Sequence, residues 1–227
     1  YYYPTSAGHG IDIYFIDTGL NTDHIDFFDY EGFDFNRTVT YTSYYQNPYH
    51  GTAVASVAAG MIFGASQKAN IHMIAVDLSV ISVLRSFDYI LLNAKPHKTI
   101  INMSFSGGSP YYQANEDKLS ELIEKGFILF TSAGNERENC CAPKESEDFH
   151  AIAGYRKAIT VSAAFSNFRS KGYTMEDFAN YGDCVDIFAP GFVAAAYATE
   201  SRLSYYPMEG TSFSSPLAAG VAATIMS

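Results

Sequence analysis

The sequence predicts an α/β fold, a doubly wound and mostly parallel sheet with helices on both faces. The main observation is that short apolar runs alternate with segments of helical periodicity along the chain. Such alternation is typical of strand and helix units joined by right-handed crossovers. The chain also has 227 residues, 48% of them hydrophobic, which is enough to fill one core. We therefore expect residues 1–227 to form a single domain.

The first expected elements lie around an aspartate and a histidine. The apolar run 11–16 predicts a buried strand that ends at Asp17. Residues 21–49 are polar, aromatic and aperiodic, so we expect loops there, with a short hairpin around residues 32–42. From His50 onward, apolar residues recur at spacings of three and four, which predicts a helix with His50 at its N-terminus. Taken alone, Asp17 is typical of a turn or cap, and His50 of a cap or surface position.

The middle of the chain repeats the alternation of strands and helices. The expected elements are strands at 71–76, 99–103 and 127–131 and helices at 80–93 and 115–125. In a parallel sheet the C-terminal ends of the strands meet at one edge, where the sites of this fold class lie. Asp17, Ser104 and Asn135 all follow expected strand ends. We therefore expect these three residues to converge.

The stretch from Gly210 to Ala222 reads GTSFSSPLAAGVA and combines a turn, several hydroxyls and a helix start. Proline lacks an N–H and is favoured in the first turn of a helix, so Pro216 predicts a helix that opens at about residues 212–215. The small apolar residues that follow predict a helix buried on all sides. Taken alone, Ser212 is an ordinary N-cap or first-turn serine.

These segments together resemble the motifs of the subtilisin-like serine proteases. Asp17 lies in IYFIDTG, His50 in HGTAVASVAAG, Asn135 in FTSAGN and Ser212 in GTSFSSPLAAGVA. The order Asp, His, Ser along the chain is the order of this family, and the opening YYYPTSAGHG is similar to the stretch before the catalytic Asp in its proteinase K branch. The resemblance implies a subtilisin-like fold and one peptidase domain, trimmed at both ends relative to family members.

The resemblance implies a role for each of these residues. Ser212 is the expected nucleophile, His50 the base that takes its proton, and Asp17 the partner that orients the base. Asn135 is the expected oxyanion donor, together with the backbone N–H of Ser212.

Substrate binding is expected as β-augmentation, in which an extended peptide pairs with exposed backbone. The matching positions are Ser104, Phe105, Ser106, Ser132, Ala133 and Gly134. The family usually has glycine where this chain has Ser106, so we expect a side chain there to narrow the groove. Without the triad, these six residues are equally well explained as small residues at strand ends.

No cofactor is expected for the chemistry itself, but one metal site is implied. Asp186, in CVDIFAPG, resembles a calcium-ligating Asp of the proteinase K branch, and the carbonyls of Arg156 and Ala158 match its backbone ligands. Calcium takes several oxygen ligands, so a surface aspartate without a metal is an equal alternative.

The three cysteines allow at most one disulfide within the chain. The resemblance implies that Cys184 pairs with Cys140 or Cys141, and we favour Cys140. The alternatives are three free thiols or a metal site.

Two further departures from the family are Ala53 and Leu217, which occupy positions where histidines are common in the family. We interpret the pair as one apolar contact in place of a polar one.

The charge balance limits the expected partners. With 14 basic and 24 acidic side chains the net charge is −10, which disfavours a nucleic-acid surface and favours a soluble monomer. The apolar runs are too short for a membrane helix, and Tyr1 does not begin a signal peptide. We interpret the chain as a mature product, and the resemblance implies secretion.

The expected function is a serine endopeptidase that hydrolyses peptide bonds of proteins through an acyl-enzyme, with its own prodomain as a further partner. The alternative is a catalytically inactive, subtilisin-like binding or decoy protein. The missing ends and the altered motif around Phe213, Ser214 and Leu217 favour this alternative.

Overall fold

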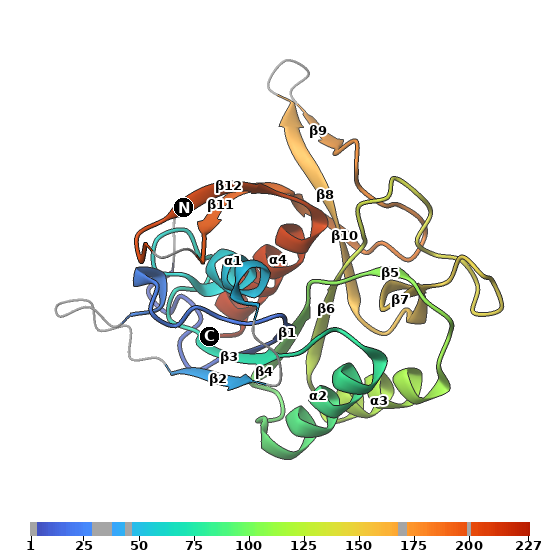
Figure 1. The fold of residues 1–227 in the computed structure, drawn as a ribbon, viewed down its shortest axis with the longest axis horizontal. Helices are drawn as coiled ribbons and strands as arrows, with labels where there is room; N and C mark the ends of the chain where they lie inside the picture. Colours follow the sequence, from blue (N-terminus) through green and yellow to red (C-terminus); the bar gives the residue numbers. More distant parts are fainter. Residues whose placement is uncertain (1–3, 29–37, 44–46, 168–171, 199–200) are drawn as a thin grey trace.

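The computed structural model describes residues 4–28, 38–43, 47–167, 172–198 and 201–227. Its centre is an eight-stranded sheet (Figure 1) with the order β10-β8-β6-β4-β1-β3-β2, and β9 pairs with β8. All neighbours along this path are parallel, and β9 is antiparallel to β8. The strands of this sheet are β1 (Asp12–Asp17), β2 (Val39–Ser43), β3 (Asn70–Ala75), β4 (Thr99–Met103), β6 (Ile128–Ser132), β8 (Ile159–Asn167), β9 (Gly172–Met175) and β10 (Ile187–Pro190).

Helices cover both faces of the sheet, which confirms the predicted doubly wound α/β class. The helices are α1 (Pro48–Ala59), α2 (Val80–Asn93), α3 (Gln113–Glu124) and α4 (Thr211–Met226), with short 3-10 helices at Ile25–Phe27 and Ala153–Tyr155. Two small antiparallel pairs complete the fold, namely β5 (Gly107–Gly108) with β7 (His150–Ala151) and β11 (Phe192–Ala196) with β12 (Tyr205–Glu209). Figure 1 shows α1 and α4 together on one side of the sheet and α2 and α3 together on the other.

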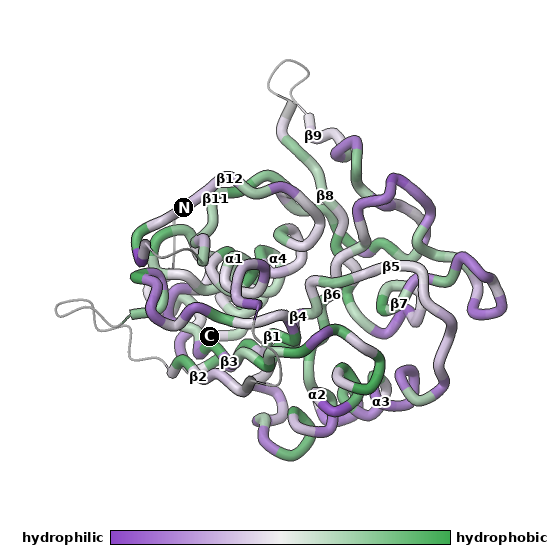
Figure 2. The backbone as a smooth tube through the Cα atoms, viewed as in Figure 1, coloured by the Kyte–Doolittle hydropathy of each residue, from purple (hydrophilic) through white to green (hydrophobic). Residues whose placement is uncertain are grey.

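The two helical layers are built from different residues. Residues 51–59 of α1 are all buried, and α4 is buried along most of its length, so both helices have small apolar residues on nearly every side. In α2, by contrast, the buried residues are confined to one face. Figure 2 shows the most hydrophilic stretches in peripheral loops, including those beside β7. No helix among the described residues has the length and apolar character that a membrane span requires.

Most expected elements are present, and α2 and β4 have the expected bounds. The hairpin expected around residues 32–42 lies partly outside the described residues. Its described part belongs to β2, which pairs in parallel with β3 and not with an antiparallel neighbour.

The expected start of the last helix was wrong. Gly210, whose φ of 140° favours glycine, precedes a helix that begins at Thr211, so Pro216 is inside the helix and not in its first turn. Because Pro216 has no N–H, it leaves the carbonyl of Ser212 without its usual partner four residues on. That carbonyl instead accepts a hydrogen bond of 2.8 Å from Ser104 Oγ. A hydrogen bond from the segment that follows β4 therefore satisfies the carbonyl that the proline leaves free.

The sheet order places the C-terminal end of β1 at the centre of the site edge. β1 lies between β3 and β4, and the chain passes to opposite sides of β1 to form these two neighbours. Open α/β sheets bind ligands at such a switch point. Asp17 is the last residue of β1, and Ser104 directly follows β4.

Candidate active site

Asp17 and His50 form a hydrogen-bonded acid–base pair. His50 Nδ1 donates to Asp17 Oδ1 over 2.8 Å, and the Asp17 side chain is only 1% exposed. The backbone N–H of Thr18 donates to the same oxygen over 2.7 Å. Asp17 Oδ2 is buried and accepts no hydrogen bond from the described residues. Since Nδ1 carries the proton in this arrangement, Nε2 of His50 is the nitrogen that can accept another.

The start of α1 brings His50 close to the end of β1. Pro48 opens the helix, a position at which its missing N–H costs nothing. Directly after His50, a Cβ on Gly51 would lie 2.2 Å from the carbonyl oxygen of Gly19 and 3.1 Å from Asp17 Oδ1. Only glycine allows this close approach, so Gly51 sets the distance between the helix and the carboxylate.

The neighbourhood of His50 makes its imidazole a stronger base than usual. Burial lowers the pKa of His50. The charge of Asp17 and the hydrogen bond to that carboxylate together raise this pKa by more than burial lowers it, so the pKa lies above its ordinary value. A raised pKa favours proton uptake from a nearby hydroxyl.

Ser212 is the second residue of α4 and is half-buried. Its hydroxyl donates to the backbone carbonyl of Ser104 over 3.2 Å, and among the described residues it forms no hydrogen bond with His50. The ring of Phe213, the next residue, lies 6.1 Å from the His50 ring. The nucleophile expected from the sequence is therefore near the expected base, with its hydroxyl directed to another acceptor.

A buried polar network holds α4 against β4, and sequence analysis missed it. Ser215 Oγ donates to Asn102 Oδ1 over 2.8 Å, and Asn102 Nδ2 donates to Ser104 Oγ over 2.9 Å. Ser104 Oγ in turn donates to the Ser212 carbonyl. Each hydroxyl and amide group has its partner, which rigidifies such networks. The asparagine inside the apolar run TIINM is the signal that could have indicated it.

Asn135 is fixed by the residue before Ser212. Asn135 Oδ1 accepts hydrogen bonds from the backbone N–H of Thr211 over 2.9 Å and from Thr211 Oγ1 over 3.0 Å. Thr211 was not predicted, and it also accepts the N–H of Gly134 at Oγ1 over 3.1 Å. Because Oδ1 is occupied, the exposed amide is oriented with Nδ2 as the group that can donate to a bound molecule.

The six expected substrate-binding residues lie on two adjacent segments, 104–106 after β4 and 132–134 at the end of β6. Ser106 Oγ donates to the carbonyl of Ala133 over 3.2 Å, so the two segments are joined at this point. The Ser104 side chain is buried in the network with Asn102, which leaves its backbone as the part that can meet a peptide. Ser132 and Ala133 are also buried, whereas Phe105 and Ser106 are half-buried.

Asp186 is exposed, and Thr160 N–H donates to its Oδ2 over 2.8 Å. Two groups of side chains among the described residues could hold a metal ion, and Asp186 is in neither. The first is Glu136, Glu138 and His150, and the second is Cys140, Cys141 and Cys184. The second group offers only the Cys140 thiol as a ligand, because Cys141 and Cys184 are joined in a disulfide.

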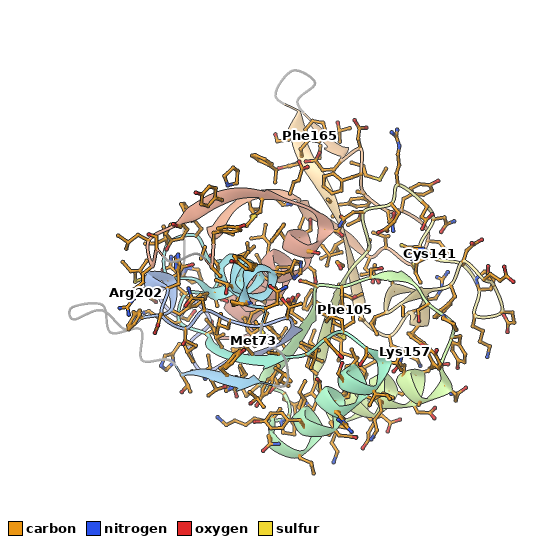
Figure 3. The ribbon with its side chains drawn as sticks, in the orientation of Figure 1. Met73, Phe105, Cys141, Lys157, Phe165 and Arg202 are labelled. Carbon is orange, nitrogen blue, oxygen red and sulfur yellow. A yellow bond between two sulfur atoms is a disulfide. The ribbon has the colours of Figure 1, made fainter. Side chains whose placement is uncertain are left out.

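The preference for Cys140 as the disulfide partner was wrong. Cys141 is bonded to Cys184, with a Cα–Cα distance of 5.4 Å, and Cys140 is a buried free thiol. Cys140 Sγ lies 3.8 Å from Cys184 Sγ, so the choice depends on the directions of two neighbouring side chains, which spacing along the chain does not indicate. Burial raises the pKa of the Cys140 thiol to about 11. Figure 3 labels Cys141 in the outer loops beside β7.

Ala53 and Leu217 lie in the same buried apolar cluster, where α1 and α4 pack together. Both residues therefore contribute apolar surface to the packing of the two helices. Neither residue leaves an unpaired polar group in the core.

Comparisons with known proteins find similarity over nearly the whole chain. A family model described as the subtilase family matches residues 8–227. The subtilisin-like serine protease pepC of Aspergillus niger is 31% identical over 251 residues, which cover 100% of this chain and 43% of that protein. Alkaline protease 1 of Emericella nidulans is 31% identical and covers 97% of this chain and 53% of its own length. The chain thus spans about half the length of these relatives.

The fold of the chain is also similar to that of a solved subtilisin-like structure. The crystal structure of a cold adapted subtilisin-like serine proteinase matches with a TM-score of 0.79 and 27% identity. The match covers 98% of this chain and 77% of the other.

Proposed function

Because the chain belongs to the subtilase family, we propose that it is a serine endopeptidase that hydrolyses peptide bonds of proteins through an acyl-enzyme on Ser212. The observation that carries this proposal is the buried Asp17 carboxylate, 2.8 Å from Nδ1 of a histidine whose pKa is raised. A serine hydroxyl is a poor nucleophile unless such a base takes its proton.

In the proposed reaction the Ser212 hydroxyl turns from the Ser104 carbonyl to His50 Nε2. His50 takes the proton as the serine oxygen attacks the peptide carbonyl carbon, and Asp17 stabilises the imidazolium that forms. Nδ2 of Asn135 and the Ser212 N–H donate to the resulting oxyanion. His50 then gives its proton to the leaving amine, and a water molecule hydrolyses the ester by the same route in reverse.

The peptide substrate pairs its backbone with residues 104–106 and 132–134 as an added strand. The half-buried Phe105 and Ser106 support this proposal because they are accessible to a peptide. The family's preference for apolar or aromatic side chains is the default specificity.

A structural calcium ion at Asp186 is also part of the proposal. Asp186 Oδ2 is occupied by Thr160, while Oδ1 accepts no hydrogen bond from the described residues. The proposed ligands are Oδ1 and the carbonyls of Arg156 and Ala158, oxygen atoms of the kind that calcium takes, with water filling the remaining positions. Calcium should raise the melting temperature of the native chain and leave that of Asp186→Asn unchanged. Equal shifts in both proteins would exclude this site.

We further propose that the protein is a secreted monomer whose partners include its own prodomain. The disulfide between Cys141 and Cys184 supports an oxidising compartment. The net charge of −10 favours separation between copies. Light scattering at several protein concentrations tests the monomer, and a mass that rises with concentration would contradict it.

The second candidate is an inactive binding or decoy protein. The observation that favours it is the Ser212 hydroxyl, which donates to Ser104 and not to His50. A serine-directed fluorophosphonate separates the two functions. Labelling of the native chain but not of Ser212→Ala supports the peptidase. Absence of labelling in a folded sample supports the decoy. Ser214→Ala is the matched control, because Ser214 Oγ also donates to a backbone carbonyl, that of Pro190 over 3.2 Å.

A further inference from the structure

The loop after Asn135 and the short strand β7 (Figure 1) bring two carboxylates and an imidazole together. Glu136, Glu138 and His150 each offer one ligand atom, and these three atoms lie within 4.8 Å of one another. The ligand atoms of a tetrahedral zinc ion lie about 3.4 Å apart, because each bond is about 2.0 to 2.2 Å long. Both glutamate side chains are exposed, so movements of about 1 Å can close the three atoms around one ion.

His150 is the buried member of this group. Its side chain is 3% exposed, and its backbone is held because β7 pairs with β5. Nε2 lies 2.9 Å from Glu138 Oε1, whereas Nδ1 is buried and has no hydrogen-bond partner among the described residues. A buried imidazole with an unpaired nitrogen is incompletely satisfied by the protein. Its other nitrogen is directed at the carboxylates, as a metal ligand has to be.

The charges of Glu136 and Glu138 are not balanced by lysine or arginine side chains. Among the described residues neither glutamate forms an ion pair with either type of residue, and Arg137, which lies between them in the sequence, pairs with Asp177 over 3.9 Å. Two carboxylates held close together repel each other and attract a cation. A divalent ion balances both charges at once.

The backbone of this loop is fixed by Asn180, which is fully buried. The N–H groups of Glu136 and Glu138 both donate to Asn180 Oδ1 over 3.0 Å. Asn180 Nδ2 donates to the carbonyl of Ala133 over 3.0 Å and to Glu136 Oε2 over 2.7 Å. The two carboxylates therefore project from a loop that is already ordered, which lowers the entropic cost of binding an ion.

We propose that Glu136, Glu138 and His150 form a site for a divalent transition-metal ion, zinc in particular. Zinc takes histidine nitrogen together with carboxylate oxygen, whereas calcium and magnesium take oxygen ligands. Three protein ligands leave the fourth position of the zinc ion to water.

The site is connected to the proposed oxyanion donor. Glu136 Oε2 accepts the backbone N–H of Asn135 over 2.9 Å. A zinc ion on the other oxygen of this carboxylate therefore restrains the side chain that holds the backbone of Asn135. This connection rests on the proposed function, whereas the binding of zinc does not depend on it.

The first test measures zinc binding by calorimetry, with zinc chloride and the Ser212→Ala protein, in which the proposed peptidase cannot digest itself. Glu136→Gln and Glu138→Gln should each lower the affinity at least about tenfold. Both amides keep an oxygen that can accept the hydrogen bonds of the native side chain, so the loss reports on the ligand and not on the fold. Glu147→Gln, which removes the same charge from another exposed glutamate, should keep the affinity. Absence of binding, or unchanged affinity in either ligand variant, would overturn the inference.

The second test identifies the nitrogen ligand by NMR of the histidine rings. Zinc should shift the ring nitrogen signals of His150, which are assigned by their absence in His150→Gln. Excess calcium should leave these signals in place, because calcium takes oxygen ligands. Signals of His150 that do not move with zinc would overturn the inference, as would equal movements with calcium. If His150→Gln does not fold, the two glutamate variants keep the inference testable, because their side chains are exposed.

Discussion

The two helices that carry the proposed base and nucleophile hold these residues in different ways. On α1, His50 is fixed by one charged contact, the 2.8 Å hydrogen bond to the buried Asp17 carboxylate. On α4, the contacts that hold Ser212 within the described part of the chain are neutral, since both its hydroxyl and its carbonyl bond to Ser104. The charged contact raises the pKa of His50 and so changes its chemistry. The neutral contacts determine position alone.

This difference indicates a division of labour between the two sides of the site. Substitutions on the α1 side should alter both the rate and its pH dependence, because they change the charge beside the base. Substitutions on the α4 side should alter the rate alone. Ser212 itself is a special case on the α4 side, because no other residue can replace it as the nucleophile. The following predictions test this division, from the largest effect to the smallest.

Ser212→Ala should lower kcat for peptide hydrolysis about a million-fold, the order of magnitude found when the nucleophile of a subtilisin is removed. The fold should persist, because Ser212 is half-buried and its carbonyl, not its hydroxyl, accepts from Ser104. Circular dichroism and a peptide assay on the purified protein check both parts. Ser214→Ala is the control and should retain activity, whereas activity retained in Ser212→Ala would exclude Ser212 as the nucleophile.

Asp17→Asn should lower kcat/KM about ten-thousandfold and move its pH dependence. The neutral imidazole is the active form, so activity rises as the pH rises through the pKa of His50. Asp17 raises that pKa and burial lowers it. Without the carboxylate only the lowering effect remains, and the midpoint of the pH profile should move toward acid. A midpoint that stays in place, or moves toward alkaline pH, would contradict the assigned role of Asp17.

Much of the fold could be predicted from the sequence because local patterns determine it. Strands such as β4 are continuous apolar runs, and α2 places its buried residues at helical spacing, so periodicity alone gave their bounds. The start of α4 could not be predicted in this way. Pro216 lies inside that helix and leaves the carbonyl of Ser212 free, and Ser104, 108 positions before Ser212, donates to that carbonyl. Sequence patterns do not carry such long-range contacts.

The site was predictable where a motif marks it and not where packing decides it. The motifs around Asp17 and His50 indicated a pair that the structure holds at hydrogen-bond distance. The cysteines carry no such information, because Cys140 and Cys141 differ by one residue in their distance along the chain from Cys184.

Asn135→Ala should slow kcat about a hundredfold to a thousandfold, the effect of losing one oxyanion donor in a subtilisin. KM should change little, because the donor acts on charge that develops in the transition state. The pH midpoint should stay in place, since Asn135 contacts Thr211 and not His50. Kinetics of the two proteins across pH measure all three quantities. If the rate falls and the midpoint of the pH profile also shifts, then substitutions on the α4 side change the pH dependence too, and the proposed difference between the α1 side and the α4 side is wrong.

Ser104→Ala tests the neutral contacts and should have the smallest effect on rate. The substitution removes the hydroxyl that donates to the Ser212 carbonyl over 2.8 Å and leaves that carbonyl and Asn102 Nδ2 without this partner. An unpaired buried polar group lowers the free energy of unfolding by about 1 to 3 kcal/mol. If about 1 kcal/mol of this loss also appears in the transition state, kcat falls about fivefold. Urea unfolding and kinetics measure the two effects. Ser104→Thr, which retains a hydroxyl, is the control for loss of the donor.

Because Ser104 carries no charge and does not bond to His50, the pH midpoint of Ser104→Ala should match that of the native chain. A shifted midpoint in Ser104→Ala would mean that the network on the α4 side also governs the base, and the division between the two helices would be wrong.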